Sequence, residues 1–273
     1  MILVIGATGG VGRHVVGELL AQERAVRAVV RTPEAANLPP DVDVVPGDLA
    51  DPATMVAALA GVDSVFLLWP FFSADGTATA VQVIAEHARR IVYLSAEAAA
   101  ADRTSVWAVM ERQIAESGVE WTFLRPTGFA KNTLGWADQI RSGVVHGPYG
   151  EAARSLIDER DIASVAVQAL TKNGHAGEVY VLSGPGTVTQ AEQVRIIGAA
   201  VGRHVRWSEQ SREQARPGLA KIFGDESFVE GALDTWAGFV ARPERVTATV
   251  QVITGAPARS FSQWATEHAD AFR

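Results

Sequence analysis

A glycine-rich turn near the N-terminus is the first segment whose residue types and spacing suggest chemistry. Gly6, Gly9 and Gly12 lie three residues apart, between an apolar run at 2–5 and a helix-like segment at 11–20. In a strand–turn–helix of this kind, the glycines allow a tight turn, the close approach of a pyrophosphate and close packing of helix on strand. The helix N-terminus adds free N–H groups and a positive dipole end. The turn therefore predicts a dinucleotide site, with an ordinary turn as the alternative; its residues are Gly6, Thr8, Gly9, Gly10, Val11 and Gly12.

The end of the second apolar run, at 26–30, indicates which dinucleotide would bind. NAD sites place an Asp or Glu there for the ribose 2′-hydroxyl, whereas NADP sites use a cation for the 2′-phosphate. Residues 30–33 contain no carboxylate, and Arg31 can contact a phosphate in bidentate fashion. We therefore expect NADPH as the cofactor, unless Arg31 is an ordinary solvated side chain. Arg13, just after the glycine turn, is a second candidate phosphate ligand.

Short apolar runs alternate with helix-like segments through the first half of the chain. The runs predicted as strands are 2–5, 26–30, 42–45, 64–68, 91–94 and 119–124. The segments predicted as helices are 11–20, 51–59, 77–87 and 104–116. This alternation is typical of a parallel sheet with helices on both faces, which predicts an α/β fold with a Rossmann-type doubly wound sheet.

The rhythm of the sequence loosens after Pro126. We expect further helices at 161–170, 190–201, 226–240 and 261–272, and strands at 178–182 and 205–207. This pattern predicts a cofactor-binding core at 1–126. Residues 127–273 then form a small substrate lobe, interleaved with the last strand of the sheet and the C-terminal helices.

Composition excludes several classes of protein. The chain has 273 residues, a net charge of −7 and no cysteine, so it lacks thiolate catalysis, disulfides and zinc fingers. The acidic balance argues against nucleic-acid binding, and no apolar run is long enough for a membrane span. The six histidines show no metal-ligand spacing. A cytoplasmic protein without a metal site is the expectation, and its oligomeric state stays open.

Several short motifs, taken as a set, resemble one known family. They are GATGGVGR at 6–13, Arg31, GDL at 47–49, YLSA at 93–96, Glu111, ESG at 116–118, WTFLRP at 121–126, RDIA at 160–163 and YVLSGP at 180–185. The chain is similar to the atypical short-chain dehydrogenases, and more narrowly to the NmrA-like group that includes NAD(P)H:quinone reductases. The resemblance implies strand order 3-2-1-4-5-6, usually with a seventh strand. It also implies that Asp48, followed by Leu49, contacts the adenine and that Leu68 and Trp69 line the cofactor.

The proton-donating pair of ordinary short-chain dehydrogenases is missing. These enzymes use Tyr-x-x-x-Lys, in which the tyrosine protonates the carbonyl oxygen as hydride arrives. The three tyrosines and three lysines of this chain form no such pair. The resemblance places Trp107 and Glu111 at the two positions, and neither can do the same chemistry. Ser95 matches a position where the family often keeps a hydroxyl, so it is the candidate catalytic residue.

Three functions remain compatible with this sequence. Hydride can go to a quinone, whose delocalised anion needs no strong acid, or to an aromatic polyketide-like ketone with Ser95 or water as the relay. Alternatively, the protein binds NADP(H) without chemistry, as a redox sensor. Aromatic residues favour a small aromatic or quinoid substrate, unless they only pack the core. The candidate substrate contacts are Trp69, Phe71, Trp107, Phe129, Trp136 and, as a proton relay, His146.

Overall fold

The computed structural model describes residues 1–223 and 226–273, and the chain divides into two compact units. The first unit consists of Met1–Pro126, Glu159–Leu182 and Thr249–Ala256. The second consists of Thr127–Asp158, Ser183–Ala248 and Pro257–Arg273. Each unit is therefore assembled from three separate segments of the chain.

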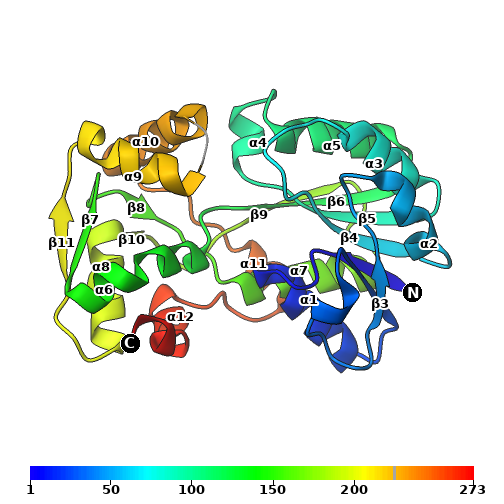
Figure 1. Cartoon of the computed structure of the whole chain (residues 1–273), viewed down its shortest axis with the longest axis horizontal. Coiled ribbons are helices and arrows are strands. Elements are labelled where there is room, and N and C mark those ends of the chain that lie inside the picture. Colours follow the sequence, from blue (N-terminus) through cyan, green and yellow to red (C-terminus); the bar gives the residue numbers. More distant parts are fainter. Residues whose placement is uncertain (224–225) are drawn as a thin grey trace. The chain divides into compact units, whose positions relative to one another are not determined.

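A seven-stranded parallel sheet forms the centre of the first unit (Figure 1). Its strands are β1 (Ile2–Ile5), β2 (Val26–Val30), β3 (Asp43–Pro46), β4 (Ser64–Leu68), β5 (Arg90–Leu94), β6 (Glu120–Pro126) and β9 (Glu178–Leu182). They are arranged in the order β3-β2-β1-β4-β5-β6-β9, and all six pairings are parallel. The doubly wound fold and the strand order expected from the sequence are thus confirmed, including the seventh strand.

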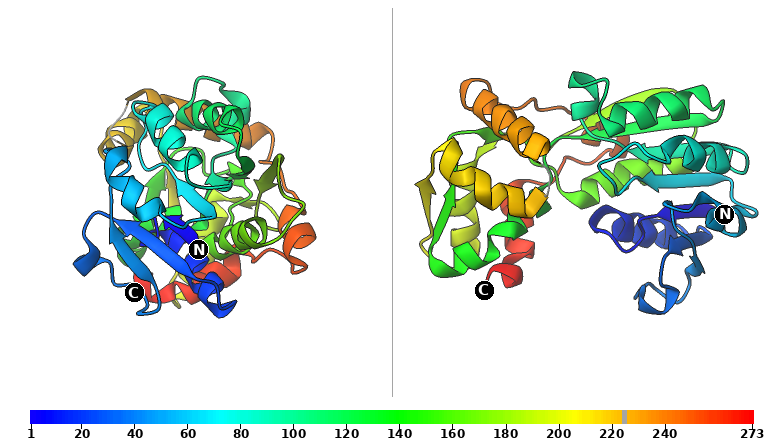
Figure 2. Two further views of the ribbon diagram at one scale, coloured as in Figure 1. Left: turned by 90° about the vertical axis from the view of Figure 1, so that its right-hand side faces the viewer. Right: turned by 45° about the horizontal axis from the view of Figure 1, so that its top comes forward.

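Helices cover both faces of this sheet (Figures 1 and 2). They are α1 (Gly10–Ala21), α2 (Val56–Leu59), α3 (Thr77–Ala85), α4 (Ala98–Ala101), α5 (Val106–Glu116), α7 (Glu159–Thr171) and α11 (Thr249–Thr254), with 3₁₀ turns η1 (Pro33–Ala35) and η2 (Pro52–Met55). Helices α1 and α7 pack together on one face, and α3 and α5 on the other. The β1 and β5 strands are buried along their whole length because both faces are covered.

The predicted helix at 51–59 is wrong in its first half. Residues Pro52–Met55 form a 3₁₀ turn, and the α-helix begins only at Val56. The Thr54 hydroxyl donates to the carbonyl oxygen of Asp51 at 2.7 Å and itself accepts from the N–H of Asp48 at 2.9 Å. A threonine that bonds the local backbone in this way competes with regular α-helix.

The second unit contains two small two-stranded sheets and a set of helices. The sheets pair β7 (Val144–Gly147) with β11 (Arg206–Glu209) in parallel, and β8 (Ala153–Arg154) with β10 (Val188–Thr189) in antiparallel fashion. The helices are α6 (Ala137–Ser142), α8 (Gln190–Ala200), α9 (Arg212–Phe223), α10 (Glu226–Ala241) and α12 (Phe261–Glu267), with 3₁₀ turns η3 (Ala130–Trp136) and η4 (Ala269–Phe272). The predicted helix at 261–272 is therefore interrupted at His268. In the part of the chain that the structure describes, no helix is long and apolar enough to cross a membrane.

Candidate cofactor and active site

The glycine turn connects β1 to α1 and leaves the start of the helix open. Gly6 has a φ of +84°, a left-handed conformation that glycine adopts without strain. The α1 helix begins after Gly9 with no side-chain cap and no acidic residue in its first turn. Its first N–H groups and its positive dipole end are thus available to an anion.

Gly12 and Gly9 differ in how much the fold itself needs a glycine at each position. A Cβ atom on Gly12 would lie 2.1 Å from the carbonyl oxygen of Gly6, so only glycine allows α1 to pack this closely on the turn. At Gly9, φ is −77°, and a Cβ atom would meet only the Gly6 oxygen, at 3.1 Å. The fold itself therefore hardly needs a glycine at position 9. A pyrophosphate that passes over this backbone would need a glycine there, because a side chain would stand in its way. The glycine at position 9 therefore fits a dinucleotide site.

Two arginines lie near the ends of β1 and β2. The Arg13 guanidinium donates to the carbonyl oxygen of Thr8 at 2.9 Å and to that of Gly9 at 3.3 Å, which holds a positive charge beside the turn. Arg31 directly follows β2, is exposed, and forms no ion pair with any residue that the structure describes. It is therefore available to a ligand phosphate.

Asp48 lies in the loop after β3. Its Oδ1 atom accepts a hydrogen bond from the N–H of Ala50 at 2.9 Å, which folds the loop back on itself. The carboxylate is half-buried, while the neighbouring Leu49 is buried. Asp48 can therefore shape the loop with one oxygen and accept from an adenine amino group with the other.

The end of β4 lies against the glycine turn. A Cβ atom on Gly6 would lie 2.8 Å from Cδ2 of Leu68, so this leucine closely borders the turn. Trp69 is only 6% exposed, packs in the core of the first unit, and donates its indole N–H to the carbonyl oxygen of Ser73 at 3.0 Å. Trp69 therefore packs against the core of the first unit, and its contact with a cofactor or substrate stays a prediction.

A buried ionic network lies at the ends of β5 and β6. The Ser95 hydroxyl donates to Oε1 of Glu111 at 2.6 Å. Arg125 donates from Nε to Oε1 at 2.9 Å and from Nη2 to Oε2 at 2.5 Å. The carboxylate raises the pKa of the Arg125 guanidinium, chiefly through this hydrogen bond. Ser95 and Glu111 are 3% and 6% exposed, so the network belongs to the interior.

Tyr93, two residues before Ser95, has a fully buried ring. Its hydroxyl has no hydrogen-bond partner among the residues that the structure describes. Burial raises the pKa of the Tyr93 hydroxyl, and the charge of Glu111 raises it further. Tyr93 is therefore a poor source of protons.

The expected substrate contacts are divided between the two units. In the first unit, Phe71 is 38% exposed, and its ring packs edge-on against that of Trp69 with 5.0 Å between the ring centroids. Trp107 is half-buried against the core of the same unit. The members in the second unit are Phe129, Trp136 and His146. The Trp136 ring meets Trp207 edge-on at 5.8 Å. His146 is exposed on β7, and its role as a proton relay stays a prediction.

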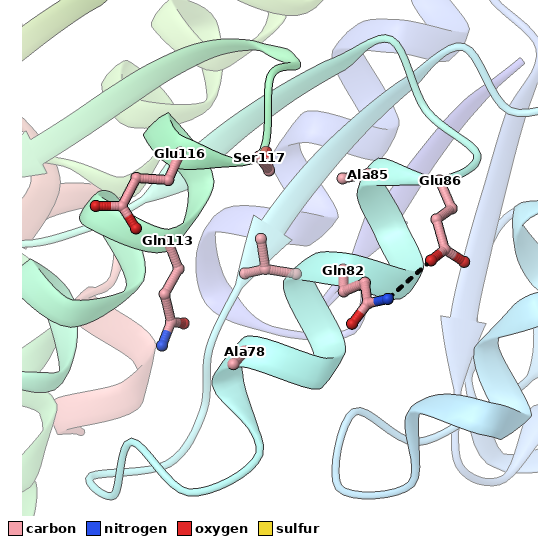
Figure 3. A pocket seen from close by; sticks show the side chains of 8 residues that line it. Ala78, Gln82, Ala85, Glu86, Gln113, Glu116 and Ser117 are labelled. Atoms are coloured by element: carbon pink, nitrogen blue, oxygen red, sulfur yellow. Dashed lines mark hydrogen bonds between the residues drawn. The ribbon is translucent and has the colours of Figure 1, made fainter.

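A groove on the first unit contains none of these residues (Figure 3). It lies between α3 and the end of α5, where Gln82 donates to Glu86 at 3.0 Å. Its lining residues are Ala78, Val81, Gln82, Ala85, Glu86, Gln113, Glu116 and Ser117. The candidate site is therefore defined by the turn and the strand ends, and not by this groove.

Comparison with known proteins identifies the family of this chain. The family model described as NAD(P)H-binding matches residues 6–173, which include the glycine turn, Ser95 and Glu111. The chain belongs to this NAD(P)H-binding family. Its similarity to the atypical short-chain dehydrogenases of the NmrA-like, quinone-reductase group is also confirmed.

Two relatives and one solved structure illustrate the family. The chain is 40% identical to the (4-alkanoyl-5-oxo-2,5-dihydrofuran-3-yl)methyl phosphate reductase of Streptomyces griseus, covering 100% of this chain and 99% of the relative. It is 36% identical to the NAD(P)H azoreductase of Xenophilus azovorans, with the same coverage. The structure of an NADPH-dependent quinone oxidoreductase from Escherichia coli shares the fold, with a TM-score of 0.82 at 23% identity over 98% of this chain and 99% of that one. This chain is thus an NAD(P)H-dependent oxidoreductase. This result argues against the alternative of a redox sensor without chemistry.

Sequence reasoning missed the partnership of Glu111 with Arg125. The resemblance places Glu111 at the position of the lysine and predicts no partner for it. A signal was nevertheless present, because the buried residues of α5 are Val106, Met110, Glu111 and Ile114. A glutamate in a helical apolar stripe indicates a buried carboxylate, which requires a cationic or hydrogen-bonding partner.

Proposed function

We propose that this family member reduces small, electron-poor conjugated acceptors, such as quinones and conjugated carbonyl compounds, with NADPH as the hydride donor. NADPH supplies a hydride from C4 of its nicotinamide ring. The preference for NADPH over NADH is supported by Arg31, which is exposed and unpaired among the described residues at the end of β2. No carboxylate stands at that strand end to bind a ribose 2′-hydroxyl.

The hydrogen bond from the Ser95 hydroxyl to Glu111 is the observation that supports this choice of substrate class. Its hydrogen is donated to Glu111, and the nearby Tyr93 hydroxyl is buried with a raised pKa. Neither side chain suits the protonation of a basic alkoxide formed from an isolated ketone. A conjugated acceptor forms a delocalised anion instead, and water can protonate that anion without a strong acid from the protein.

The names of the relatives describe substrates with this property. The furanone phosphate carries a ring double bond that is conjugated with both its 5-oxo and its 4-alkanoyl group. The other names specify an azo compound and a quinone. Each of these acceptors spreads the added electron pair over a conjugated system. This shared property supports conjugated acceptors as the substrates of this chain.

The experiment measures NADPH consumption with a quinone, an aromatic ketone and an unconjugated cyclic ketone. We expect kcat/KM for the quinone to exceed that for the unconjugated ketone by about 10²-fold or more, the typical contribution of a general acid. Equal kcat/KM values for the quinone and the unconjugated ketone would contradict the proposal, because the protein would then have to supply a strong acid.

A further inference from the structure

The Ser95–Glu111–Arg125 network fixes the direction of every hydrogen bond within it. A guanidinium group has only donors, so both oxygens of Glu111 accept from Arg125. A protonated carboxyl group would place a hydrogen on one of these oxygens and break a bond. Glu111 is therefore a carboxylate, and the hydrogen between Ser95 and Glu111 belongs to the serine.

This assignment leaves Ser95 with lone pairs only. A serine hydroxyl has one hydrogen and two lone pairs, and the hydrogen is held by Glu111 at 2.6 Å. The backbone is fixed as well, since the N–H of Ser95 donates to the carbonyl oxygen of Leu124 at 2.8 Å. The side-chain hydroxyl of Ser95, a residue with 3% of its surface exposed, can therefore contact a ligand only as an acceptor.

The position of Ser95 in the sheet indicates which part of a dinucleotide would reach it. The candidate adenosine contacts Arg31 and Asp48 follow β2 and β3, and the glycine turn follows β1. On the opposite side of β1 lie β4 and then β5, whose next residue is Ser95. A dinucleotide with its pyrophosphate at the turn therefore extends its second nucleoside toward β4 and β5.

We propose that Ser95 accepts a hydrogen bond from the nicotinamide nucleoside of NADPH, and that Glu111, held by Arg125, acts as a positioning residue that prevents Ser95 from donating to the substrate. The donors on that half of NADPH are the ribose hydroxyls and the carboxamide amine. The inference rests on the proposed NADPH site. It would replace the expectation that Ser95 is the catalytic residue that relays a proton to the substrate.

The test compares three ligands that contain increasing parts of the cofactor. Calorimetric titrations use 2′,5′-ADP, 2′-phospho-ADP-ribose and NADPH with the wild type, Ser95→Ala and Glu116→Gln. The last variant is a control on the same helix, because Glu116 is exposed. Thermal unfolding without ligand checks that each variant is folded. Ser95→Cys, which keeps the volume with a weaker acceptor, replaces Ser95→Ala if the latter does not fold.

We expect Ser95→Ala to bind 2′,5′-ADP like the wild type and to bind NADPH about two- to tenfold more weakly, as for the loss of one hydrogen bond. A loss already seen with 2′-phospho-ADP-ribose assigns the donor to the ribose, and a loss confined to NADPH assigns it to the carboxamide. Glu111→Gln should weaken NADPH binding in the wild type but not in the Ser95→Ala background, because Glu111 acts through Ser95.

Two results would overturn this inference. Unchanged NADPH affinity together with a kcat reduced about 10²-fold would make Ser95 a donor to the substrate, and this result would also remove the Ser95 argument for conjugated acceptors. Unchanged affinity and unchanged kcat would reduce Ser95 to a packing residue. Failure of the wild type to bind NADPH would instead contradict the proposed function itself.

Discussion

Alanine substitutions at Gly9 and Gly12 should separate the needs of the fold from the needs of the cofactor. At Gly9 the backbone already has a φ of −77°, and the new Cβ atom meets one oxygen at 3.1 Å, which requires a shift of a few tenths of an ångström. At Gly12 the Cβ atom would lie 2.1 Å from the Gly6 oxygen and 2.7 Å from the Gly6 carbonyl carbon. The helix α1 would have to move away from the turn by roughly 1 Å to restore an ordinary contact.

Gly9→Ala should therefore impair NADPH binding more than stability, whereas Gly12→Ala should lower the stability of the unliganded protein. Gly9→Ala should change the free energy of unfolding by less than about 1 kcal/mol, because reduced freedom of the unfolded chain offsets the tight contact. It should nevertheless weaken NADPH binding about ten- to a hundredfold, since displacing the pyrophosphate costs a charge-assisted hydrogen bond of about 1.5–3 kcal/mol. Gly12→Ala should destabilise the unliganded protein by about 3 kcal/mol.

The assay is thermal unfolding without ligand, followed by titration with NADPH. A loss of about 3 kcal/mol at Gly12 lowers the Tm by roughly 6–12 °C for a chain of this size, whereas Gly9→Ala should unfold within about 3 °C of the wild type. The reasoning is refuted if Gly9→Ala binds NADPH normally, because no ligand then passes over that backbone. It is also refuted if Gly12→Ala is as stable as the wild type.

Three further substitutions test other features of the first unit. Arg31→Ala should reduce the preference for NADPH over NADH about ten- to a hundredfold, as measured by titration with both; a wild type that binds the two equally would contradict the role of Arg31. Tyr93→Phe should leave the free energy of unfolding in urea unchanged or raise it by about 1 kcal/mol, since the hydroxyl is buried without a partner among the described residues; a clear loss would reveal one. Burial, followed by the charges of Arg90 and Lys172, lowers the pKa of His175, so the folded state binds fewer protons there. Stability should therefore fall as the pH drops below about 6.5, and His175→Gln should fall less steeply in the same measurement.

Much of the first unit was predictable from the sequence because its signals are local. Apolar runs bounded by turn residues gave β2, β4 and β9 with their observed limits. Both faces of β2 and β4 are largely covered, and apolar runs result from that burial, whereas β9 lies at the edge of the sheet and is more exposed. The glycine turn was recognisable for a similar reason, since its spacing follows from contacts within eight residues of chain.

The rest depends on contacts that join distant segments. The β7 strand was missed because its partner β11 lies more than sixty residues further along, and its four residues have no regular apolar pattern. The bond between Glu111 and Arg125 joins a helix to a strand end, and the preference of Ser95 for accepting follows only from that pair.

The three-segment construction of each unit constrains how such proteins can recombine with their relatives. A single crossover after Pro126 would combine β6 and α1 from one parent with β9, α7 and α11 from the other. The α1–α7 contact includes a hydrogen bond from the Ser164 hydroxyl to Glu18 at 2.6 Å, so the hybrid interface would have to match side chain by side chain. The second unit is therefore exchanged as a whole only when residues 159–182 and 249–256 stay with the glycine turn. A chimera built in this way has five junctions, and each of them falls where the chain passes from one unit to the other.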